Sequence, residues 1–441
     1  MQSAMQTRKI RESVIVKSVD VAVVGGGIVG SVLAKGLAER AGLSVALIDS
    51  APVIQSVAEV SKANALDFNP FTDTRVIALA RRTVDELKAL NVPLEKLADI
   101  YHGETPPSID SIEVSDRGHL GLVNLAAEDY RIPSFGQVVS LSALTRLVAS
   151  SSNDYEHIAP ATVQSVTQHQ NYTEVALDNG DTRRAKLVVL ADGGRSALAQ
   201  QVGLTRTAND YEQTAIVFNV HTQQPHNNKA YERFTESGPL AFLPFDSDID
   251  NQKSTGCGFS VVWTVKADKA EALLSMTNKA FVDALQDAFG FRQGKIIRVS
   301  DKASYPLSLK LVDEVTAHRT VVVGNAAQSL HPIAGQGFNL GLRDIYTLIS
   351  TLQSERLNKS SVDKDGEFDP GQFNVLNTYA KKRKKDRAAT ITLTDTLVHT
   401  FSNQHFPLVV GRNVSLMALS MVPFAKKQFV KQTTGYGLGA R

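Results

Sequence analysis

The apolar positions near the start of the chain change from a strand pattern to a helix pattern and back. Residues 20–24 are a short β-branched run, which is typical of a buried parallel strand. Residues 31–38 then carry apolar side chains at helical spacing, and Gly42 ends that helix. A second strand follows at residues 44–49. The pattern predicts a βαβ unit of about 30 residues that finishes on the carboxylate of Asp49.

Further elements are predicted in the next third of the chain. The spacing of apolar residues predicts an amphipathic helix over 75–90 and another over 142–149, with Ser142 as its N-cap. Two strands are expected between 174 and 190, joined by the turn residues 178–181.

The middle and the end of the chain have different patterns. Alternating apolar and polar positions at 111–115 and over much of 212–305 predict a mostly antiparallel sheet that could wall a pocket. The stretch 353–372 is polar and contains Gly and Pro, which predicts a mobile linker. Helical patterns dominate from residue 373 onward.

Composition excludes several classes of protein. The chain has 441 residues, of which 43% are hydrophobic and 21% charged, and its formal net charge is +2. This balance is ordinary for a soluble protein and gives no reason to expect a nucleic-acid partner. The single cysteine, Cys257, excludes an internal disulfide and a cysteine-ligated metal cluster. Residues 1–19 are expected to form a flexible tail without a secretory signal, and no apolar run approaches the roughly 20 residues of a membrane span. We therefore expect a cytoplasmic protein, with peripheral contact at the inner face of a membrane left open.

The first candidate for chemistry is the glycine-rich turn after the first strand. Gly25 allows a tight turn, Gly27 lets the backbone approach a pyrophosphate, and Gly30 lets the helix pack close to the sheet. Asp49 is placed to accept hydrogen bonds from the ribose hydroxyls of an adenosine. A turn with only a structural role is the weaker alternative, because strand, glycines, helix and acid occur together. We therefore predict dinucleotide binding.

A second glycine-rich turn lies far along the chain, after an apolar run that ends at residue 323. Asn325 can bond a ribityl hydroxyl or a water that bridges the pyrophosphate, while Gly335 and Gly337 give access to the backbone. The N–H groups near Phe338 and Asn339 mark a predicted helix start, which favours the negative charge that a flavin gains at N1 and O2 on reduction. Two such turns indicate one long cofactor held at both ends, which points to FAD.

Four further residues complete the candidate site. Asp192 ends a predicted buried strand, where nucleotides bind to α/β sheets, and a plain Asp-Gly turn is the alternative. Arg75 could meet the pyrophosphate with its guanidinium group, or be an ordinary exposed arginine. Pro332 fixes its loop, and we favour a structural role for His331 over a role in the pocket. No metal site is predicted.

Taken together, these residues resemble the class A FAD-dependent aromatic hydroxylases and, within them, the ubiquinone-biosynthesis hydroxylases. The motifs come in the family's order from residue 20 onward. Residues 231–235 and 238–244 are also typical of this subgroup, and residues 401–403 and 407–413 are similar to those of 2-polyprenyl-6-methoxyphenol hydroxylases.

The chain also departs from the family's pattern at three places. Asn325 replaces the usual Asp, Gln328 replaces a frequent His, and Asp49 is shorter than the common Glu. An amide still donates and accepts hydrogen bonds, so FAD binding is expected to survive these changes.

The resemblance implies an α/β fold like that of p-hydroxybenzoate hydroxylase. In this fold a Rossmann-type FAD-binding domain is interleaved with an antiparallel-sheet substrate domain, and C-terminal helices follow. We expect an FAD-binding domain at 20–105, 136–205 and 306–352, a substrate domain at 106–135 and 206–305, a linker at 353–372 and a C-terminal helical region at 373–441.

The resemblance also implies a reaction. NAD(P)H reduces the flavin, O₂ adds at its C4a carbon, and the hydroperoxide transfers oxygen to the ring of a polyprenylated phenol during ubiquinone biosynthesis. Two alternatives stay open: a flavin monooxygenase of another aromatic or isoprenoid substrate, and a non-catalytic flavoprotein subunit of a quinone-synthesis complex. The segment 406–429 and the basic run 381–385 could meet an anionic membrane, or be a helical cover and a solvated helix face.

Overall fold

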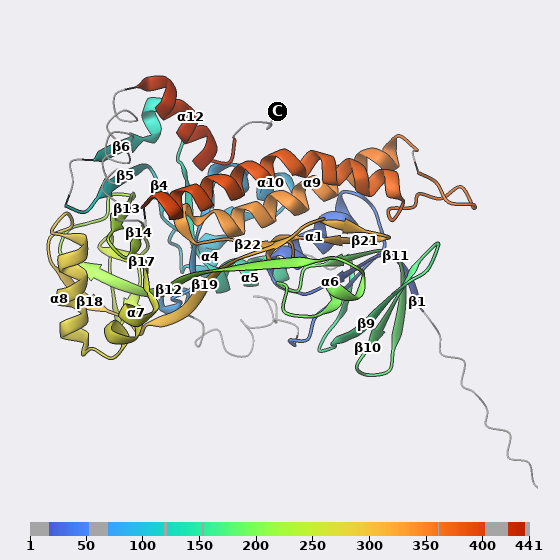
Figure 1. Ribbon diagram of the computed structural model, residues 1–441, viewed down its shortest axis with the longest axis horizontal. Helices are drawn as coiled ribbons and strands as arrows, with labels where there is room; N and C mark the ends of the chain where they lie inside the picture. The colour runs from blue at the N-terminus through green and yellow to red at the C-terminus, as the bar shows by residue number, and fades with distance from the viewer. Residues whose placement is uncertain are drawn as a thin grey trace, which may run out of the picture.

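Two large β-sheets lie toward opposite ends of the molecule, and two long helices extend between them (Figure 1). The computed structural model describes residues 17–52, 69–118, 121–151, 154–359, 361–401 and 422–436.

The first sheet is mainly parallel. Its strands are β1 (Lys17–Val24), β2 (Val45–Ile48), β8 (Glu156–Ile158), β9 (Val163–Gln168), β10 (Thr173–Leu177), β11 (Thr182–Leu190), β20 (Thr316–Ala317) and β21 (Thr320–Val322). Their order is β20-β21-β11-β1-β2-β8, with β10 joining β9 to β11. Strands β21, β11, β1, β2 and β8 run parallel. With α1 (Ile28–Glu39) between β1 and β2, the predicted βαβ unit is confirmed, although β1 begins three positions before residue 20.

The second sheet is antiparallel apart from the β5–β13 pair. Its strands are β5 (Ser111–Asp116), β6 (Leu122–Ala126), β12 (Arg206–Thr222), β13 (Lys229–Thr235), β14 (Gly238–Pro244), β17 (Gly258–Lys266), β18 (Ile296–Val299), β19 (Ala303–Val312) and β22 (Gln328–Ser329). The order is β22-β19-β12-β17-β14-β13-β5-β6, and β18 pairs with β12. This confirms the predicted antiparallel sheet. Strand β19 belongs to it, whereas the sequence places 306–352 with the cofactor-binding part.

Smaller strands and the helices complete the fold. A third sheet joins β3 (Val76–Ala80), β7 (Gly136–Ser140) and β4 (Ser108–Ile109), and β15 (Asp248–Ile249) pairs with β16 (Gln252–Lys253). The other helices are α3 (Arg81–Ala89), α4 (Leu97–Ile100), α5 (Leu141–Ser150), α6 (Leu198–Gln201), α7 (Ala267–Leu274), α8 (Asn278–Phe289), α9 (Gln336–Leu357), α10 (Phe373–Phe401) and α12 (Pro423–Thr433). The short 3-10 helices are η1 (Pro70–Thr72), η2 (Leu94–Lys96), η3 (Ala127–Tyr130), η4 (Gly324–Ala326) and η5 (Ile333–Gly335).

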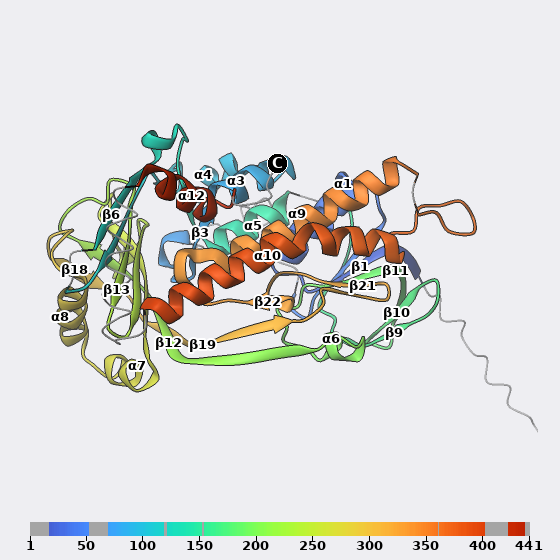
Figure 2. The same ribbon diagram turned by 45° about the horizontal axis from the view of Figure 1, so that its top comes forward.

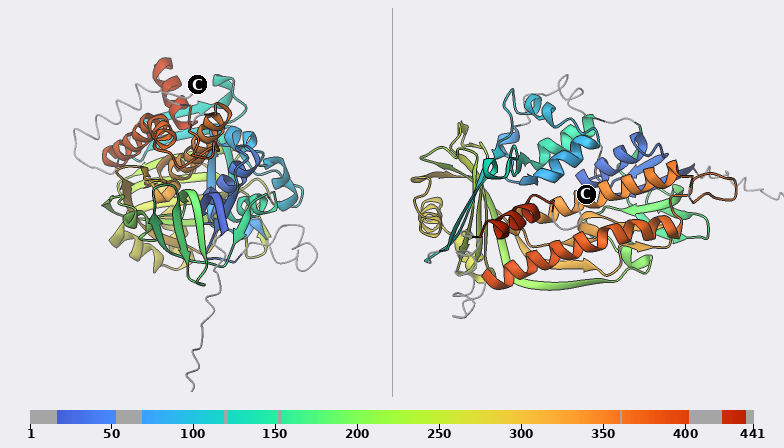
Figure 3. Two further views of the ribbon diagram at one scale, coloured as in Figure 1. Left: turned by 90° about the vertical axis from the view of Figure 1, so that its right-hand side faces the viewer. Right: turned by 90° about the horizontal axis from the view of Figure 1, so that it is seen from above.

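The apolar core is divided between the two sheets. One cluster fills the space between the first sheet and its helices and continues onto β5, β6 and β13 of the second sheet. The other packs the second sheet against α7 and α8. Helices α9 and α10 lie side by side over the first sheet, and α10 reaches the second (Figures 2 and 3). Both sheets are therefore tied to the same pair of helices.

Two predicted elements are wrong in detail. Residues 75–90 are not one helix, because Val76–Ala80 is strand β3 and the helix α3 begins at Arg81. The strand is favoured because its backbone pairs with β7, where Ile77 and Ala78 lie opposite Val139 and Val138. The N-cap of α5 is Ser140 and not Ser142, since the Ser140 Oγ accepts a hydrogen bond from the Ala143 N–H at 3.2 Å.

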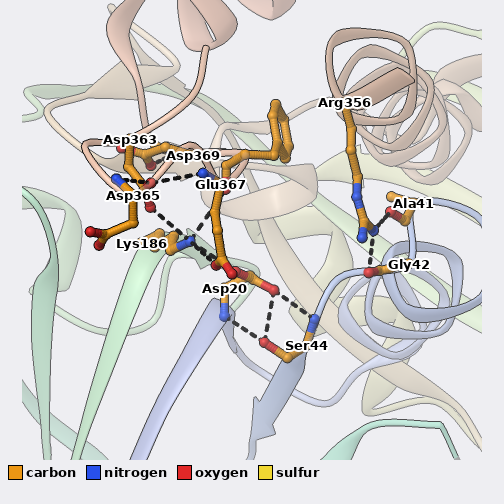
Figure 4. Close-up of polar contacts among 12 residues, drawn as sticks. Asp20, Ala41, Gly42, Ser44, Lys186, Arg356, Asp363, Asp365, Glu367 and Asp369 are labelled. Carbon is orange, nitrogen blue, oxygen red and sulfur yellow. Dashed lines mark hydrogen bonds and ion pairs between the residues drawn. The ribbon is translucent and has the colours of Figure 1, made fainter. Parts of the chain in front are cut away.

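The segment 353–372 is not a free linker. Its first residues belong to α9, and the remainder is fastened to the first sheet (Figure 4). Lys186 of β11 lies 3.2 Å from Asp363, and Arg319 forms a buried ion pair with Asp369 at 2.7 Å. Polar composition predicted mobility here because charged residues usually face water, and the sequence does not reveal their partners on β11 and beside β21.

Candidate cofactor site and adjoining cavity

Four of the predicted site residues meet at one edge of the first sheet. Because β1, β2, β11 and β21 are parallel, their carboxyl ends lie at the same edge. Gly25, Asp49, Asp192 and Asn325 each follow one of these four strands. This edge is where open α/β sheets bind nucleotides.

The first glycine turn is shaped by close backbone packing. Gly25 has φ of +106°, and a Cβ there would lie 2.6 Å from the Ala191 carbonyl oxygen. A Cβ at Gly30 would lie 1.8 Å from the Gly25 carbonyl oxygen, so both positions require glycine. Gly27 differs, because no atom of the described residues lies within 4 Å of its Cβ position. Gly27 therefore leaves open space at the N-terminus of α1, where the free N–H groups favour an anion such as a pyrophosphate.

The two carboxylates at this edge already have local partners. Asp49 Oδ1 accepts a hydrogen bond from the Ala51 N–H at 2.9 Å. Asp192 Oδ1 accepts one from the Gly194 N–H at 2.9 Å, and Oδ2 accepts one from the Ser196 N–H at 3.1 Å. Asp192 thus shapes its own turn, which was the alternative considered from the sequence.

Arg206, which the sequence reasoning missed, ties two of these turns together. Its guanidinium group donates to the Gly194 carbonyl at 2.6 Å and to the Asn325 carbonyl at 2.7 Å. No motif marks Arg206, because its role depends on two loops that are distant in sequence. The Asn325 side chain stays exposed.

The two glycine-rich regions are brought together through η4. A Cβ at Gly324 would lie 3.2 Å from the Val29 side chain of α1. A Cβ at Gly341 of α9 would lie 3.0 Å from the Gly324 Cα. The N-terminal parts of α1 and α9 therefore pack against the same turn, as a single cofactor spanning both would require.

Buried charges hold this turn to the C-terminal helices. Asp344 Oδ2 accepts hydrogen bonds from the Gly324 N–H at 3.1 Å and from the Gln328 Nε2 at 2.7 Å, and Oδ1 accepts one from the Arg383 Nε at 2.8 Å. Arg387 Nε donates to the Gln328 Oε1 at 2.9 Å. Gln328, which departs from the family's pattern, is thus a bridge within this network.

The basic run 381–385 is only partly a solvated face. Its four lysines are exposed, whereas Arg383 is buried between Asp344 and Asp386. Although burial opposes it, the nearby Arg343 and Arg383 lower the pKa of Asp386.

At the second glycine region, Gly335 and Asn339 shape the start of α9. Gly335 adopts the left-handed conformation with φ of +59°. The Asn339 side chain accepts a hydrogen bond from the Ala80 N–H at 2.8 Å and donates one to the Ala78 carbonyl at 2.9 Å. Asn339 therefore joins β3 to α9 through its side chain, which leaves the helix N-terminus beside Gly337 as the feature available to a flavin.

A cavity of about 770 Å³ adjoins the start of α9. Its walls come from β3, the second sheet, α9, α10 and α12, and most of its lining is apolar. The candidate residues that line it are Arg75, Asn325, Pro332, Gly335, Gly337, Phe338 and Asn339. The candidates that lie at the first sheet and α1, outside this lining, are Gly25, Gly27, Gly30, Asp49 and Asp192.

Arg75 takes a different position than expected, whereas His331 has the structural surroundings that the sequence favoured. Arg75 does not begin a helix, and its side chain is 69% exposed beside Asp73. His331 is fully buried behind the cavity, with its Nε2 3.2 Å from the Gln213 Oε1 and its Nδ1 accepting from the Ile333 N–H. Burial lowers the pKa of His331 to about 4, so the ring is neutral near pH 7.

Within the described ranges, no three His, Cys, Asp or Glu side chains gather as metal ligands would. None of the helices that the structure describes is both long and apolar enough to span a bilayer. The C-terminal motif residues 402–403 and 407–413, and most of the segment 406–429, lie outside the described residues.

Comparisons with known proteins agree with this geometry. A family model described as FAD binding domain matches residues 128–362, and another described as FAD dependent oxidoreductase matches residues 20–102. Ubiquinone hydroxylase UbiL of Rhodospirillum rubrum is 32% identical over 429 residues, which cover 95% of this chain and 90% of that protein. The 3-demethoxyubiquinol 3-hydroxylase of Escherichia coli is 28% identical over 419 residues, or 94% and 98% of the two chains.

Solved structures extend the likeness to the fold. The crystal structure of p-nitrophenol 4-monooxygenase PnpA from Pseudomonas putida DLL-E4 has a TM-score of 0.70 and 16% identity, covering 96% of this chain and 99% of that one. The fold class and the FAD cofactor expected from the sequence are thereby confirmed.

The FAD-binding family model and the hydroxylases among its relatives define the protein as an FAD-dependent monooxygenase. The chain belongs to the ubiquinone-biosynthesis hydroxylases of the class A flavin enzymes. NAD(P)H as electron donor is typical of this family.

Proposed function

We propose that this enzyme hydroxylates the aromatic ring of a polyprenylated phenol of the 2-polyprenyl-6-methoxyphenol type. The observation that carries the proposal is the apolar cavity of about 770 Å³ between the second sheet and the start of α9. A cavity of this size with few polar groups suits an aromatic ring and the first part of a hydrocarbon tail. The relatives named as ubiquinone hydroxylases support the same class of substrate.

In this proposal the chain holds FAD along the edge of the first sheet. Gly27 and the N-terminus of α1 receive the pyrophosphate, Asp49 receives the adenosine ribose, and the start of α9 at Gly337 faces the redox ring. Asn325, whose side chain is exposed beside the cavity, is free to bond the ribityl chain. FAD bound here would supply the redox chemistry, which is reduction by NAD(P)H and activation of O₂. The protein orients the phenol and excludes water from the ring.

The division into domains follows the same proposal. The part around the first sheet binds FAD, and the part around the second sheet, at 106–135 and 206–305, receives the phenol. The cavity is lined by the second sheet, by β3 and by the start of α9, which supports a substrate held between the second sheet and that helix start.

We also propose that the enzyme meets a membrane surface, because a polyprenylated phenol partitions into lipid. Phe424 of α12 is 77% exposed, and Val422 just before the helix is 45% exposed. Lysines at 426, 427 and 431 accompany them on the same helix. Exposed apolar side chains beside basic ones are the combination that binds anionic bilayers.

The test is product analysis with purified holoenzyme, NAD(P)H and O₂. With 2-geranyl-6-methoxyphenol we expect a product that is heavier by one oxygen, formed in step with NAD(P)H oxidation. The untailed 2-methoxyphenol is the matched comparison, and we expect it to be a poor substrate. Equal rates for both phenols would indicate an enzyme of soluble aromatics. NAD(P)H oxidation that no phenol stimulates would favour the non-catalytic flavoprotein.

A further inference from the structure

The cavity wall formed by the second sheet carries a carboxyl group in an otherwise apolar row. The strand register places Glu232 of β13 opposite Val114 of β5 and Ala241 of β14. The row continues through Val262 of β17 to Val217 of β12. All five side chains line the cavity, and Glu232 is the only carboxylic acid among the described lining residues.

Glu232 has no partner among the described residues. Its Oε1 is shielded from solvent and accepts no hydrogen bond. Burial raises the pKa of Glu232 to about 7, and burial is the sole resolved cause. Glu113 points to the other face of the sheet and, unlike Glu232, has charged partners. Lys229 lies 2.8 Å and Arg292 lies 2.7 Å from its carboxylate.

The ionisable groups around the cavity do not neutralise this carboxyl. Asp116 lies on the same face of β5, Arg75 and Tyr305 line other parts of the cavity, and Asp395 of α10 accepts from Tyr211. None of them contributes to the pKa of Glu232, which therefore titrates near neutral pH.

A buried carboxyl without a hydrogen-bond partner costs free energy. Such a group persists where a ligand supplies the missing partner. A ligand in this largely apolar cavity must carry one hydrogen-bond donor on an otherwise apolar skeleton. A phenol has these properties.

We propose that Glu232 accepts the hydrogen bond of the phenol hydroxyl and takes its proton as oxygen is added to the ring. The inference rests on the proposed function. The phenol O–H bond breaks, its electron pair moves toward the ring, and the proton forms an O–H bond on Glu232. The attacked ring carbon forms its C–O bond with one atom of O₂ as the O–O bond breaks, and it then loses its own proton, which restores the aromatic ring. Glu232 returns its proton to the phenol oxygen. The other oxygen atom leaves as water, with both electrons supplied by NAD(P)H.

The pKa of a free phenol is about 10, above that of Glu232, so the proton remains on the phenol until reaction draws electrons from the ring. Glu232 is then a general base matched to neutral pH. Electron density donated by the phenol oxygen would make the ring carbons more nucleophilic toward the electrophilic oxygen.

Three variants test the inference. Glu232→Gln keeps a hydrogen-bond acceptor but cannot take the proton, and Glu232→Leu removes both properties. Glu236→Gln makes the same chemical change four positions away, at an exposed position outside the cavity lining. Flavin content and circular dichroism identify any variant that fails to fold. If Glu232→Leu does not fold, Glu232→Gln still tests the inference.

The first measurement is binding to the oxidised holoenzyme without NAD(P)H, using 2-geranylphenol and its methyl ether. Wild type and Glu236→Gln should bind the phenol about tenfold or more tightly than the ether, because a hydrogen bond to a charged group is involved. Glu232→Leu should lose this preference. An unchanged preference in Glu232→Leu would overturn the inference.

The second measurement is the pH profile of kcat/KM. The wild-type value should rise with pH through about 7, because the base must be ionised. Glu232→Gln should lose this limb and fall by roughly 10²-fold in kcat, while Glu236→Gln keeps both. An unaltered rate and profile in Glu232→Gln would overturn the inference and leave the proposed function standing. A wild-type enzyme that neither binds nor oxygenates any phenol would instead overturn the proposed function.

Discussion

At the scale of single residues, Gly27 is the position where the site is most clearly built for a ligand. Its neighbours Gly25 and Gly30 are glycines because backbone atoms lie where their Cβ would be. Gly27 has an extended backbone and open space instead, so the absence of a side chain there serves something outside the described chain.

Replacing Gly27 tests this distinction. Gly27→Ala should keep its flavin, because φ of −64° is allowed to alanine and a Cβ meets nothing within 4 Å. Gly27→Glu should purify folded but colourless, since its side chain and charge occupy the pyrophosphate position. The measurement is the ratio of flavin absorbance to protein absorbance, with circular dichroism as the control for folding. Full flavin content in Gly27→Glu would show that the pyrophosphate lies elsewhere.

Residue spacing predicted this turn because its chemistry is local: the strand, three glycines and helix follow one another directly. Spacing did not predict the partners of Asn339 or Arg206, because these lie on elements far away in sequence. The same limit hid Glu232, which the sequence shows only as part of a family-like stretch. Its lack of a partner becomes visible when the register of β13 is known.

At the scale of elements, the contact between α9 and α10 depends on charges that are buried together. Arg383 is 2% exposed and is paired with Asp344, which also holds the Gly324 N–H. Such a pair adds little stability relative to an apolar pair, but removing one partner leaves a buried charge alone.

Arg383→Leu should therefore lower the free energy of unfolding by about 3–5 kcal/mol. Lys384→Leu, a neighbouring exposed position on the same helix, should change it by less than about 0.5 kcal/mol. Urea unfolding followed by circular dichroism measures both. Similar losses in the two variants would mean that Arg383 contributes no more than a surface lysine.

The element boundaries show where patterns mislead. Apolar spacing over 75–90 fits a helix, yet its first part is a strand because β7 offers it a partner. The basic run 381–385 suggested a uniform surface, yet one of its five side chains points inward to a carboxylate of α9. In both cases the structure of the segment depends on an element that is distant in sequence, and the local pattern of residues gives no information about that element.

At the scale of the whole molecule, α12 carries the exposed Phe424 and also lines the cavity through Phe429 and Thr433. The helix lies beside the second sheet (Figure 3). Phe424 of α12 is 77% exposed. Phe373, the first residue of α10, is 82% exposed. The start of α10 lies far from α12, toward the opposite end of the molecule (Figure 1). If the membrane supplies the phenol, the end with α12 must face the lipid.

Phe424→Glu should weaken binding to anionic phospholipid vesicles by roughly tenfold, since a phenylalanine buried in lipid contributes about 1.5–3 kcal/mol. Phe373→Glu makes the same change at the other end and should leave binding as in wild type. Co-sedimentation with vesicles over a range of lipid concentrations measures both affinities. If Phe373→Glu had the larger effect, the orientation would be reversed.

The clamp on the Gly324 turn also sets an order of events during synthesis. A ribosome makes the Gly25 turn long before it makes Arg383 and Arg387. Because these arginines hold Asp344 and Gln328 in place, the second half of the proposed flavin cradle stays unfinished until both have been made. A nascent chain that ends before Arg383 would therefore be colourless, and the pigment would be acquired only after this helix is added.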